Sequence, residues 1–297
     1  MRRTGVWTVF VALLSLSSCA RRTEPSPHAA GGLDTGTSGS TRDGESNDEA
    51  SPGARAGPRW QPRRGTSWQW QLSGKVRTSY DVAMYDIDLF ETPQETIDAL
   101  HAAGRIVICY FSAGSREAFR EDADRFTPTD HKKKLEGWPG ESWLDIRSKN
   151  VRDVMRVRLD QAVKKRCDGV EPDNVDGYQN NTGFALTEAD QLDYNRFLAD
   201  EAHRRGLSVG LKNALDLARA LEPRFDWALN EQCLAQGECA KLAPFLKANK
   251  PVFHVEYVDR AVNGPAKLAA ICKRPEIKDF STLVKTAELG PERFSCW

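Results

Sequence analysis

Four carboxylates crowd into one short stretch, "CDGVEPDNVDGY" (167–178), that otherwise has the apolar character of a strand. They are Asp168, Glu171, Asp173 and Asp176. The stretch is either a solvated turn or a place where negative charge is gathered for chemistry. Clustered carboxylates raise each other's pKa, so that one of them becomes a plausible proton donor near neutral pH. The chemistry they indicate is therefore acid–base or nucleophilic work by a carboxylate pair.

Polar side chains also end the other strands that the sequence predicts. We expect eight strands, at 81–88, 105–112, 143–146, 168–175, 207–213, 226–232, 251–257 and 280–286. Each begins apolar and ends polar, for example with Asp86, Asp145, Lys212 or Glu256. A single polar strand end has an ordinary explanation, because strands run into loops. All eight ending this way favours a shared pocket.

Helices separate most of these strands. We expect them at 92–104, 148–166, 187–206, 214–224, 241–248 and 264–275, with Thr92 and Thr187 as N-caps and Gly104 and Gly206 as C-terminal stops. Alternating strands and helices imply parallel pairing, and eight units in this length predict an α/β fold, a (β/α)8 barrel of the TIM type. The alternative is an open doubly wound sheet, but no GxGxxG or P-loop signature supports it.

In a parallel barrel the carboxyl ends of all strands meet at one face, where such enzymes place the active site. The predicted pocket is acidic, since it holds Asp86, Asp145, Asp173, Glu231 and Glu256 against two lysines. Such a pocket attracts a cationic ligand, and aromatic side chains at the same rim offer flat faces for sugar rings. Carboxylate pairs with aromatic platforms suggest glycoside hydrolysis. The competing reading is that "DNVD" supplies oxygen ligands to Ca²⁺ or Mg²⁺, but the EF-hand spacing is absent, and we expect no metal and no cofactor.

Eight motifs occur in a fixed order along the chain: "WQWQLSG", "VAMYDID", "ICYFSAGSRE", "WPGESWLDIRS", "CDGVEPDNVDGYQN", "VGLKNA", "LNEQC" and "PVFHVEY". Together they closely resemble glycoside hydrolase family 114, the endo-α-1,4-polygalactosaminidases, from about Trp68 to the C-terminus. The resemblance implies a (β/α)8-type barrel that cleaves α-1,4-linked galactosamine-containing polysaccharide, such as polygalactosamine or galactosaminogalactan. Such polymers are cationic when deacetylated, which agrees with an acidic pocket.

The family's paired carboxylates lie in the motifs that match "EPDN" and "LNEQ", which makes Asp173 and Glu231 the catalytic candidates here. Strands four and six of a barrel can share one layer of inward side chains. We therefore expect a retaining mechanism with Asp173 as nucleophile and Glu231 as general acid/base, and the exchanged roles stay open. Glu171 is read as a buried structural acid. The expected substrate-binding residues are Asp86, Tyr110, Trp143, Asp145, Asn174, Asp176, Lys212, Asn213, Glu256 and Tyr257.

Several of these residues have structural alternatives. Lys212 could form a structural ion pair instead of contacting a sugar hydroxyl or holding Asp173 ionised. Glu256 and Tyr257 could be purely structural, and Asn174 and Asp176 could only shape a loop. For the whole protein, the alternative function is a lipid-anchored, non-catalytic carbohydrate-binding protein on the same barrel, although both catalytic positions are filled.

The N-terminus has the pattern of an export signal. Arg2 and Arg3 precede a short apolar run, and "LSSC" ends at Cys19, which looks like the lipidation site of a bacterial lipoprotein. The alternative is an ordinary signal peptide cleaved elsewhere. We expect a signal peptide at 1–19, a flexible low-complexity linker at 20–65, and a glycoside hydrolase domain at 66–297. The protein would then be exported and anchored to a bacterial membrane through lipid, with the outer membrane or the cell surface possible.

The remaining composition limits partners and redox state. Lysine plus arginine equals aspartate plus glutamate at 42 each, so the chain lacks the basic excess that nucleic-acid binding requires. We also expect the protein to be a monomer. Without Cys19 six cysteines remain, an even number that favours disulfides in an exported protein. Cys233 and Cys239 are close in sequence and are expected to pair. The other four could join as Cys272–Cys296 and Cys109–Cys167, but six cysteines allow 15 pairings.

Overall fold

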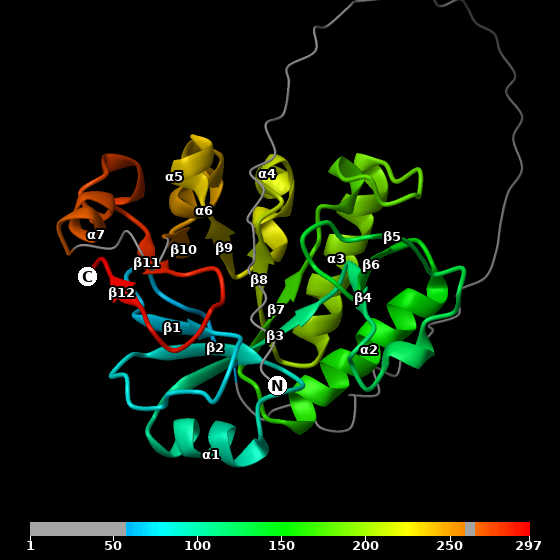
Figure 1. Cartoon of the computed structure of the whole chain (residues 1–297), viewed down its shortest axis with the longest axis horizontal. Coiled ribbons are helices and arrows are strands. Elements are labelled where there is room, and N and C mark those ends of the chain that lie inside the picture. The colour runs from blue at the N-terminus through cyan, green and yellow to red at the C-terminus, as the bar shows by residue number, and fades with distance from the viewer. Residues whose placement is uncertain (1–57, 259–264) are drawn as a thin grey trace, which may run out of the picture. The chain divides into compact units, whose positions relative to one another are not determined.

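The fold is that of a barrel, seen in a computed structural model that describes residues 58–258 and 265–297 (Figure 1). The expected lipidation site Cys19, the signal at 1–19 and most of the expected linker lie outside the described residues. Among the described residues, no helix combines the length and the apolar character that crossing a membrane would require.

The framework is a curled nine-stranded sheet, which bears out the (β/α)8-type architecture. Eight of its strands are hydrogen-bonded in parallel, in chain order. They are β1 (Trp68–Gln71), β2 (Met84–Asp88), β3 (Ile106–Ser112), β7 (Gly169–Asp173), β8 (Ser208–Lys212), β9 (Trp227–Glu231), β10 (Val252–Tyr257) and β11 (Ser281–Lys285). β12 (Phe294–Ser295) adds an antiparallel strand beside β11.

Contacts between the first and last parallel strands close the sheet on itself. The indole Nε1 of Trp68 donates to the carbonyl of Ser281 at 2.9 Å. The backbone N–H of Leu72 donates to the carbonyl of Leu289, and Arg293 donates to the carbonyl of Trp68 at 2.6 Å. The two ends of the sheet are therefore joined by side chains and by the loop after β11.

Strand alternation sorts the side chains into a lumen and an outer face, because successive residues of a strand point to opposite sides. The lower lumen is filled by large apolar side chains, among them Trp68, Met84, Trp227 and Phe253. The outer face packs against the helices and forms the larger core. The upper lumen, at the carboxyl ends of the strands, holds polar side chains, and this layer becomes the site.

Helices cover the outside of the barrel (Figure 1). They are α1 (Gln94–Ala102), α2 (Lys149–Lys164), α3 (Glu188–Arg204), α4 (Ala218–Leu221), α5 (Cys233–Gln236), α6 (Ala243–Lys247) and α7 (Pro265–Cys272). Helix α2 is capped by Ser148, and α3 has a reciprocal capping box between Thr187 and Asp190, so each begins where the side-chain chemistry predicts. Helices α4 to α6 are only one turn long, shorter than the sequence suggests.

A second, three-stranded antiparallel sheet departs from the sequence-based expectation. It consists of β4 (Ser115–Glu117), β5 (His131–Lys134) and β6 (Glu141–Leu144) in the order β4-β6-β5. The segment 143–146, predicted as a barrel strand, belongs partly to β6 and is not part of the barrel. Its place in the count is taken by β1, which the periodicity did not reveal because all four of its residues are buried.

Three disulfides brace the described chain. Cys233 and Cys239, the pair expected from their spacing, are joined. Cys272–Cys296 ties α7 to the C-terminal tail, and Cys109–Cys167 links β3 to the residues just before β7. The last bond fixes the two strands whose ends carry Ser112 and Asp173.

Gly210 is required for the aromatic layer below the site. A Cβ at this position would lie 2.2 Å from a ring carbon of Trp227, and the fully buried ring has no room to move. We expect Gly210→Ala to lower the free energy of unfolding by about 1–3 kcal/mol through overpacking, measured by chemical denaturation. Gly177→Ala is the control, since its nearest contact would be an ordinary 3.4 Å; equal losses for both variants would contradict the prediction.

Candidate active site

Lys212 lies at the centre of the polar layer, with its side chain only 2% exposed. Its Nζ is 2.8 Å from Glu171 Oε1, 3.4 Å from Asp173 Oδ2 and 3.2 Å from Glu231 Oε2. Burial lowers the pKa of Lys212, but the three carboxylates outweigh burial and the net pKa lies well above the usual value. One buried ammonium group therefore ties together the ends of β7, β8 and β9.

The backbone after these three strands turns in the same way. Asn174, Asn213 and Gln232 each follow the last residue of a strand and have positive φ angles of 60°, 46° and 63°. Left-handed backbone is uncommon outside glycine, and asparagine tolerates it best. Strain of this kind clusters at functional sites, and here it ends each strand directly behind a side chain of the cluster.

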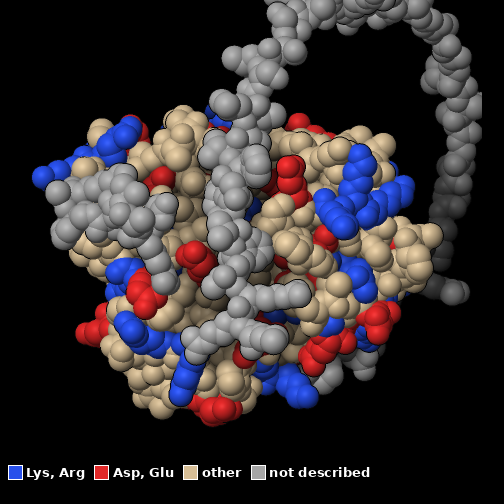
Figure 2. All heavy atoms as spheres, in the orientation of Figure 1, with Lys and Arg blue, Asp and Glu red and all other residues tan. Residues whose placement is uncertain are grey.

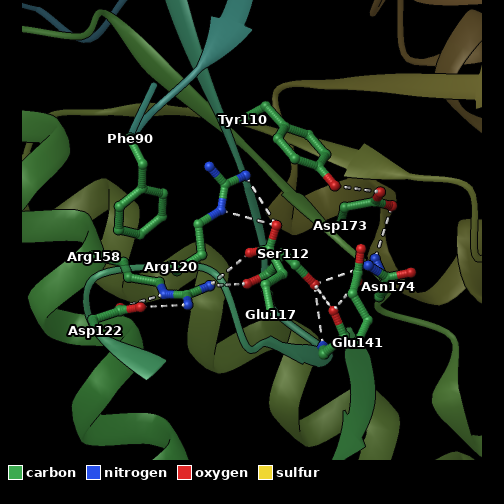
Figure 3. A network of polar contacts seen from close by, with 12 residues as sticks. Phe90, Tyr110, Ser112, Glu117, Arg120, Asp122, Glu141, Arg158, Asp173 and Asn174 are labelled. Carbon is green, nitrogen blue, oxygen red and sulfur yellow. Dashed lines mark hydrogen bonds and ion pairs between the residues drawn. The ribbon is translucent and has the colours of Figure 1, made fainter. Parts of the chain in front are cut away.

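Asp173 is held by three donors. The hydroxyl of Tyr110 donates to its Oδ2 at 3.2 Å, the backbone N–H of Asn174 donates to Oδ1 at 2.8 Å, and Lys212 contacts Oδ2. Figure 3 shows the Tyr110 and Asn174 contacts converging on this carboxylate. These contacts fix the orientation of the carboxylate at the floor of the site.

Glu231 has an equivalent set of donors at the end of β9. The amide of Asn213 donates to Oε2 at 2.9 Å, the hydroxyl of Tyr257 donates to Oε1, and Lys212 contacts Oε2. Burial raises the pKa of Glu231, but Lys212, Tyr257 and Asn213 outweigh it, so that the net pKa lies below the usual value. Asn213 also accepts from the backbone N–H of Glu231 at 3.0 Å, so the carboxylate has a fixed orientation.

A second carboxyl pair lies deeper in the lumen. Glu171 accepts from the indole of Trp70 at 3.0 Å and from Lys212. Burial raises the pKa of Asp86 well above the usual value, and Glu171 adds to the shift. Burial and the neighbouring Glu171 therefore favour the protonated form of Asp86. Burial also raises the pKa of Glu171, to about 7, against the opposing effect of Lys212.

Above this layer a cavity of about 400 Å³ opens at the carboxyl ends of the strands. It is lined by Trp70, Leu72, Tyr110, Leu135, Trp138, Glu141, Asp173, Asn174, Val175, Asp176, Lys212, Asn213, Glu231, Gln232, Tyr257, Ala287 and Leu289. A second recess of about 200 Å³ shares Asp176, Asn213 and Glu231 with it and adds Asp216 and Glu238. The two hollows therefore meet at Glu231.

Eight of the sequence-predicted site residues line the main cavity. They are Tyr110, Asp173, Asn174, Asp176, Lys212, Asn213, Glu231 and Tyr257. Their strand ends meet because β3, β7, β8, β9 and β10 run in parallel and have neighbouring registers. Burial raises the pKa of Asp176 to about 6, with a further contribution from Asp173.

Four predicted substrate-binding residues do not reach the cavity. Asp86 points into the lumen but lies a layer too low, fully buried beneath Glu171. Glu256 points outward, where it accepts from the backbone N–H of Leu234 at 2.9 Å. Asp145 is paired with Arg147 at 2.8 Å, and Trp143 is buried at the antiparallel sheet. These four side chains make structural contacts and do not line the cavity.

Among the aromatic and charged residues of the cavity, Trp138 and Glu141 escaped the sequence-based reasoning. Trp138 lies in the loop between β5 and β6, and Glu141 is the first residue of β6, so both reach the wall from outside the barrel strands. Trp70 supports Glu171 from inside the barrel through its indole N–H. The signal that could have identified Trp138 and Glu141 is "GWPGE", where an aromatic lies between two glycines and an acid follows directly in a loop-rich section.

Metal ligation does not fit the side chains gathered here. Among residues 58–258 and 265–297, the group with metal-ligand geometry is Cys233, Cys239 and His254. Its two sulfurs are joined in a disulfide and are not thiolate ligands. In the acidic layer, the ammonium of Lys212 already lies among the carboxylates, where a cation would be held.

Comparison with known proteins agrees with this geometry. The model of glycoside-hydrolase family GH114 matches residues 49–297. A crystal structure of Aspergillus fumigatus Ega3 in complex with galactosamine is 45% identical, with a TM-score of 0.77, covering 81% of this chain and 98% of that one. The glycoside hydrolase domain of PelA from Pseudomonas aeruginosa shares the fold at 13% identity and a TM-score of 0.61, covering 77% of this chain and 97% of that one. No curated protein sequence matches the chain.

Proposed function

Because this chain belongs to glycoside-hydrolase family GH114 and is a glycoside hydrolase, we propose that it is an endo-acting enzyme for α-1,4-linked galactosamine-containing polysaccharide. The observation that carries the proposal is the pair Asp173 and Glu231, which line one cavity from the ends of β7 and β9 and share Lys212. The galactosamine bound by Ega3 supports an amino sugar as substrate.

The spacing of the two carboxylates supports a retaining mechanism. Asp173 Oδ2 and Glu231 Oε2 contact the same Nζ at 3.4 and 3.2 Å, so these two oxygens are at most about 6.6 Å apart. Retaining enzymes separate their carboxyl groups by roughly 5–5.5 Å and inverting enzymes by roughly 6.5–9.5 Å. Distances up to this limit include the whole range of retaining enzymes but only the lower edge of the range of inverting enzymes.

In the proposed mechanism Asp173 attacks the anomeric carbon while Glu231 protonates the departing glycosidic oxygen. The resulting glycosyl ester on Asp173 is then hydrolysed by a water molecule, from which Glu231 removes the proton. Tyr110 and Asn174 orient Asp173, and the Nζ of Lys212 lies 3.4 Å from its Oδ2. The lowered pKa of Glu231 favours the exchanged assignment, since a general acid must start protonated; the rescue experiment described below separates the two.

The extended acidic cleft supports internal cleavage of a cationic chain. Beyond Glu231 the second recess holds Asp176, Asp216 and Glu238, the last two paired with Lys241 at 2.7 and 3.1 Å, so sugar units can bind on both sides of the cleaved bond. On the face shown in Figure 2, apart from the grey residues, acidic and basic side chains are interspersed. The acidic excess is therefore a property of the cleft, where it can attract and retain ammonium groups.

The proposed function is tested by incubating the purified protein with deacetylated α-1,4-linked galactosamine polymer. We expect new reducing ends and, early in the reaction, products of many lengths, as internal cleavage produces. Binding of the polymer without new reducing ends would instead support the non-catalytic carbohydrate-binding alternative.

We also propose export and lipid anchoring through Cys19, supported by the "LSSC" pattern after the apolar run. In a bacterial host, we expect the wild-type protein to partition into the detergent phase of a Triton X-114 extract and Cys19→Ser to partition into the aqueous phase. Cys233 is bonded to Cys239 within the folded domain, so it would not take the lipid in place of Cys19. Equal partitioning of both proteins would contradict the anchor and favour an ordinary signal peptide.

A further inference from the structure

The loop between β5 and β6 forms one wall of the cavity and contributes nothing to the barrel. Leu135 and Trp138 of this loop, and Glu141 as the first residue of β6, all line the cavity. The loop is tied to itself, since Trp138 N–H donates to the carbonyl of Leu135 and Glu141 N–H donates to the carbonyl of Trp138, each at 3.2 Å. Trp138 is nonetheless 57% exposed. A large indole left open at the mouth of a polar cavity is a site for an apolar face of a ligand.

Glu141 is the buried counterpart of this indole, with only 9% of its surface exposed. Its Oε2 accepts from Ser115 Oγ at 2.5 Å. Ser112 Oγ accepts from the amide of Asn174 at 2.8 Å and from Ser115 N–H at 3.1 Å, so its own proton goes to Ser115 Oγ at 2.7 Å. Figure 3 shows this chain from Asn174 to Glu141. Asn174, the residue next to Asp173, thereby fixes the orientation of Glu141 through Ser112 and Ser115.

Among residues 58–258 and 265–297, the second oxygen of Glu141 has no hydrogen-bond partner. In the described parts of the chain, no donor reaches Oε1 and no lysine or arginine forms an ion pair with Glu141. The nearest candidate cation, Arg120, is occupied by Asp88 at 2.6 Å and Glu117 at 2.9 Å. Burial raises the pKa of Glu141 to about 7, Glu117 and Asp173 add to the shift, and Ser115 and Arg120 oppose it. A fixed, buried carboxyl group without a cation beside the cavity is a specific acceptor for a positively charged donor.

We propose that Trp138 and Glu141 form a specificity subsite on the Asp173 side of the cleaved bond, in which the sugar ring stacks on Trp138 and its carbon-2 ammonium donates to Glu141 Oε1. This proposal deepens the proposed function and rests on it for the identity of the polymer. The position follows from the hydrogen-bond chain, which connects Glu141 to the turn after Asp173 and not to the Glu231 wall.

Electrostatics explains why such a subsite matters for an amino sugar. The transition state of glycoside cleavage carries positive charge at the anomeric carbon. In a deacetylated sugar the neighbouring carbon bears an ammonium group, and like charges at this distance oppose each other in a low-dielectric site. A carboxylate on the ammonium reduces that repulsion, and it does so more strongly as charge develops. An N-acetyl group brings no charge, so it lacks this electrostatic stabilisation and offers Glu141 only a neutral N–H donor.

The test measures binding and cleavage of matched α-1,4-linked trisaccharides, fully deacetylated or fully N-acetylated, by wild type and Glu141→Gln. Glutamine keeps the shape and an acceptor for Ser115. We expect Glu141→Gln to weaken calorimetric binding of the deacetylated trisaccharide, and to lower its kcat/KM, by roughly 10- to 100-fold. The N-acetylated values should change less than about threefold. Trp138→Ala should weaken binding of both trisaccharides.

The neighbouring exposed Glu136 provides the control, because Glu136→Gln changes the same loop charge without lining the cavity. Equal losses on both trisaccharides for Glu141→Gln, or no loss on either, would overturn the subsite. If wild type cleaves neither trisaccharide yet prefers the deacetylated one in binding, and Glu141→Gln removes that preference, the hydrolytic function fails while the subsite stands. Unchanged melting temperatures exclude misfolding as the cause.

Discussion

Asp173→Asn is expected to reduce kcat on deacetylated galactosamine polymer by at least about 10³-fold, and Glu231→Gln by roughly 10²- to 10⁴-fold. Asparagine removes the nucleophilic oxygen charge and keeps one acceptor oxygen for the donors Tyr110 and Asn174, and glutamine removes the proton-transfer group. The measurement is the initial rate of reducing-end formation. Because the two groups act as one unit, the double variant should lose little more than the worse single variant.

Asp145→Asn serves as the control, because it also removes a carboxylate near the carboxyl end of a predicted strand. Asp145 is paired with Arg147 away from the cavity, so we expect more than half of the wild-type rate. If activity survives in both Asp173→Asn and Glu231→Gln, the catalytic assignment is wrong.

The roles of the two residues can be separated with azide and a substrate whose leaving group needs no proton, an aryl α-glycoside of a galactosamine oligomer. Asp173→Ala should be rescued through direct attack on the substrate, which gives a β-glycosyl azide. Glu231→Ala should instead form the glycosyl ester on Asp173 and release it to azide as an α-glycosyl azide. The opposite pairing of products would establish the exchanged roles, which the low pKa of Glu231 favours.

The meeting of Asp173, Lys212 and Glu231 at one cavity could be predicted because strand alternation and parallel pairing are both local rules. Asp173, Lys212 and Glu231 are the last residues of β7, β8 and β9, and their motifs resemble one family. Two errors in the strand assignment cancelled, since β1 was missed and 143–146 was counted. For this reason β7 and β9 kept the fourth and sixth positions.

The sequence was a poorer guide to how deep a side chain lies in the barrel and to which side the last residue of a strand points. The side chain of Asp86 points into the barrel, as that of Asp173 does. It lies one layer lower because β2 is staggered against β7 in the curled sheet. Glu256 is next to the inward Tyr257 and therefore faces the helices. The position of Glu141 could not be predicted from the barrel pattern, because it depends on an antiparallel sheet inserted after β3. No periodicity of the barrel extends to that insertion.

Replacing Lys212 by methionine should have the largest effect on stability. Methionine fills a similar volume but leaves Glu171 buried without its cation, and breaking a buried ion pair costs about 3–5 kcal/mol. By contrast, Lys149→Met removes a surface pair with Asp153 in which the lysine is 89% exposed, and should change the free energy of unfolding by less than about 1 kcal/mol. Denaturant unfolding at pH 8 measures both.

The loss should depend on pH in a defined direction. Without Lys212, the pKa of Glu171 rises above its wild-type value of about 7, whereas the unfolded value stays near 4.3. Between these two values the folded variant binds more protons than the unfolded chain, so its stability falls as pH rises. Glu171 is protonated at pH 5, where it needs no cation. Lys212→Met should therefore lose less stability at pH 5 than at pH 8, and a loss independent of pH would mean that Lys212 stabilises the barrel by packing and not by neutralising Glu171.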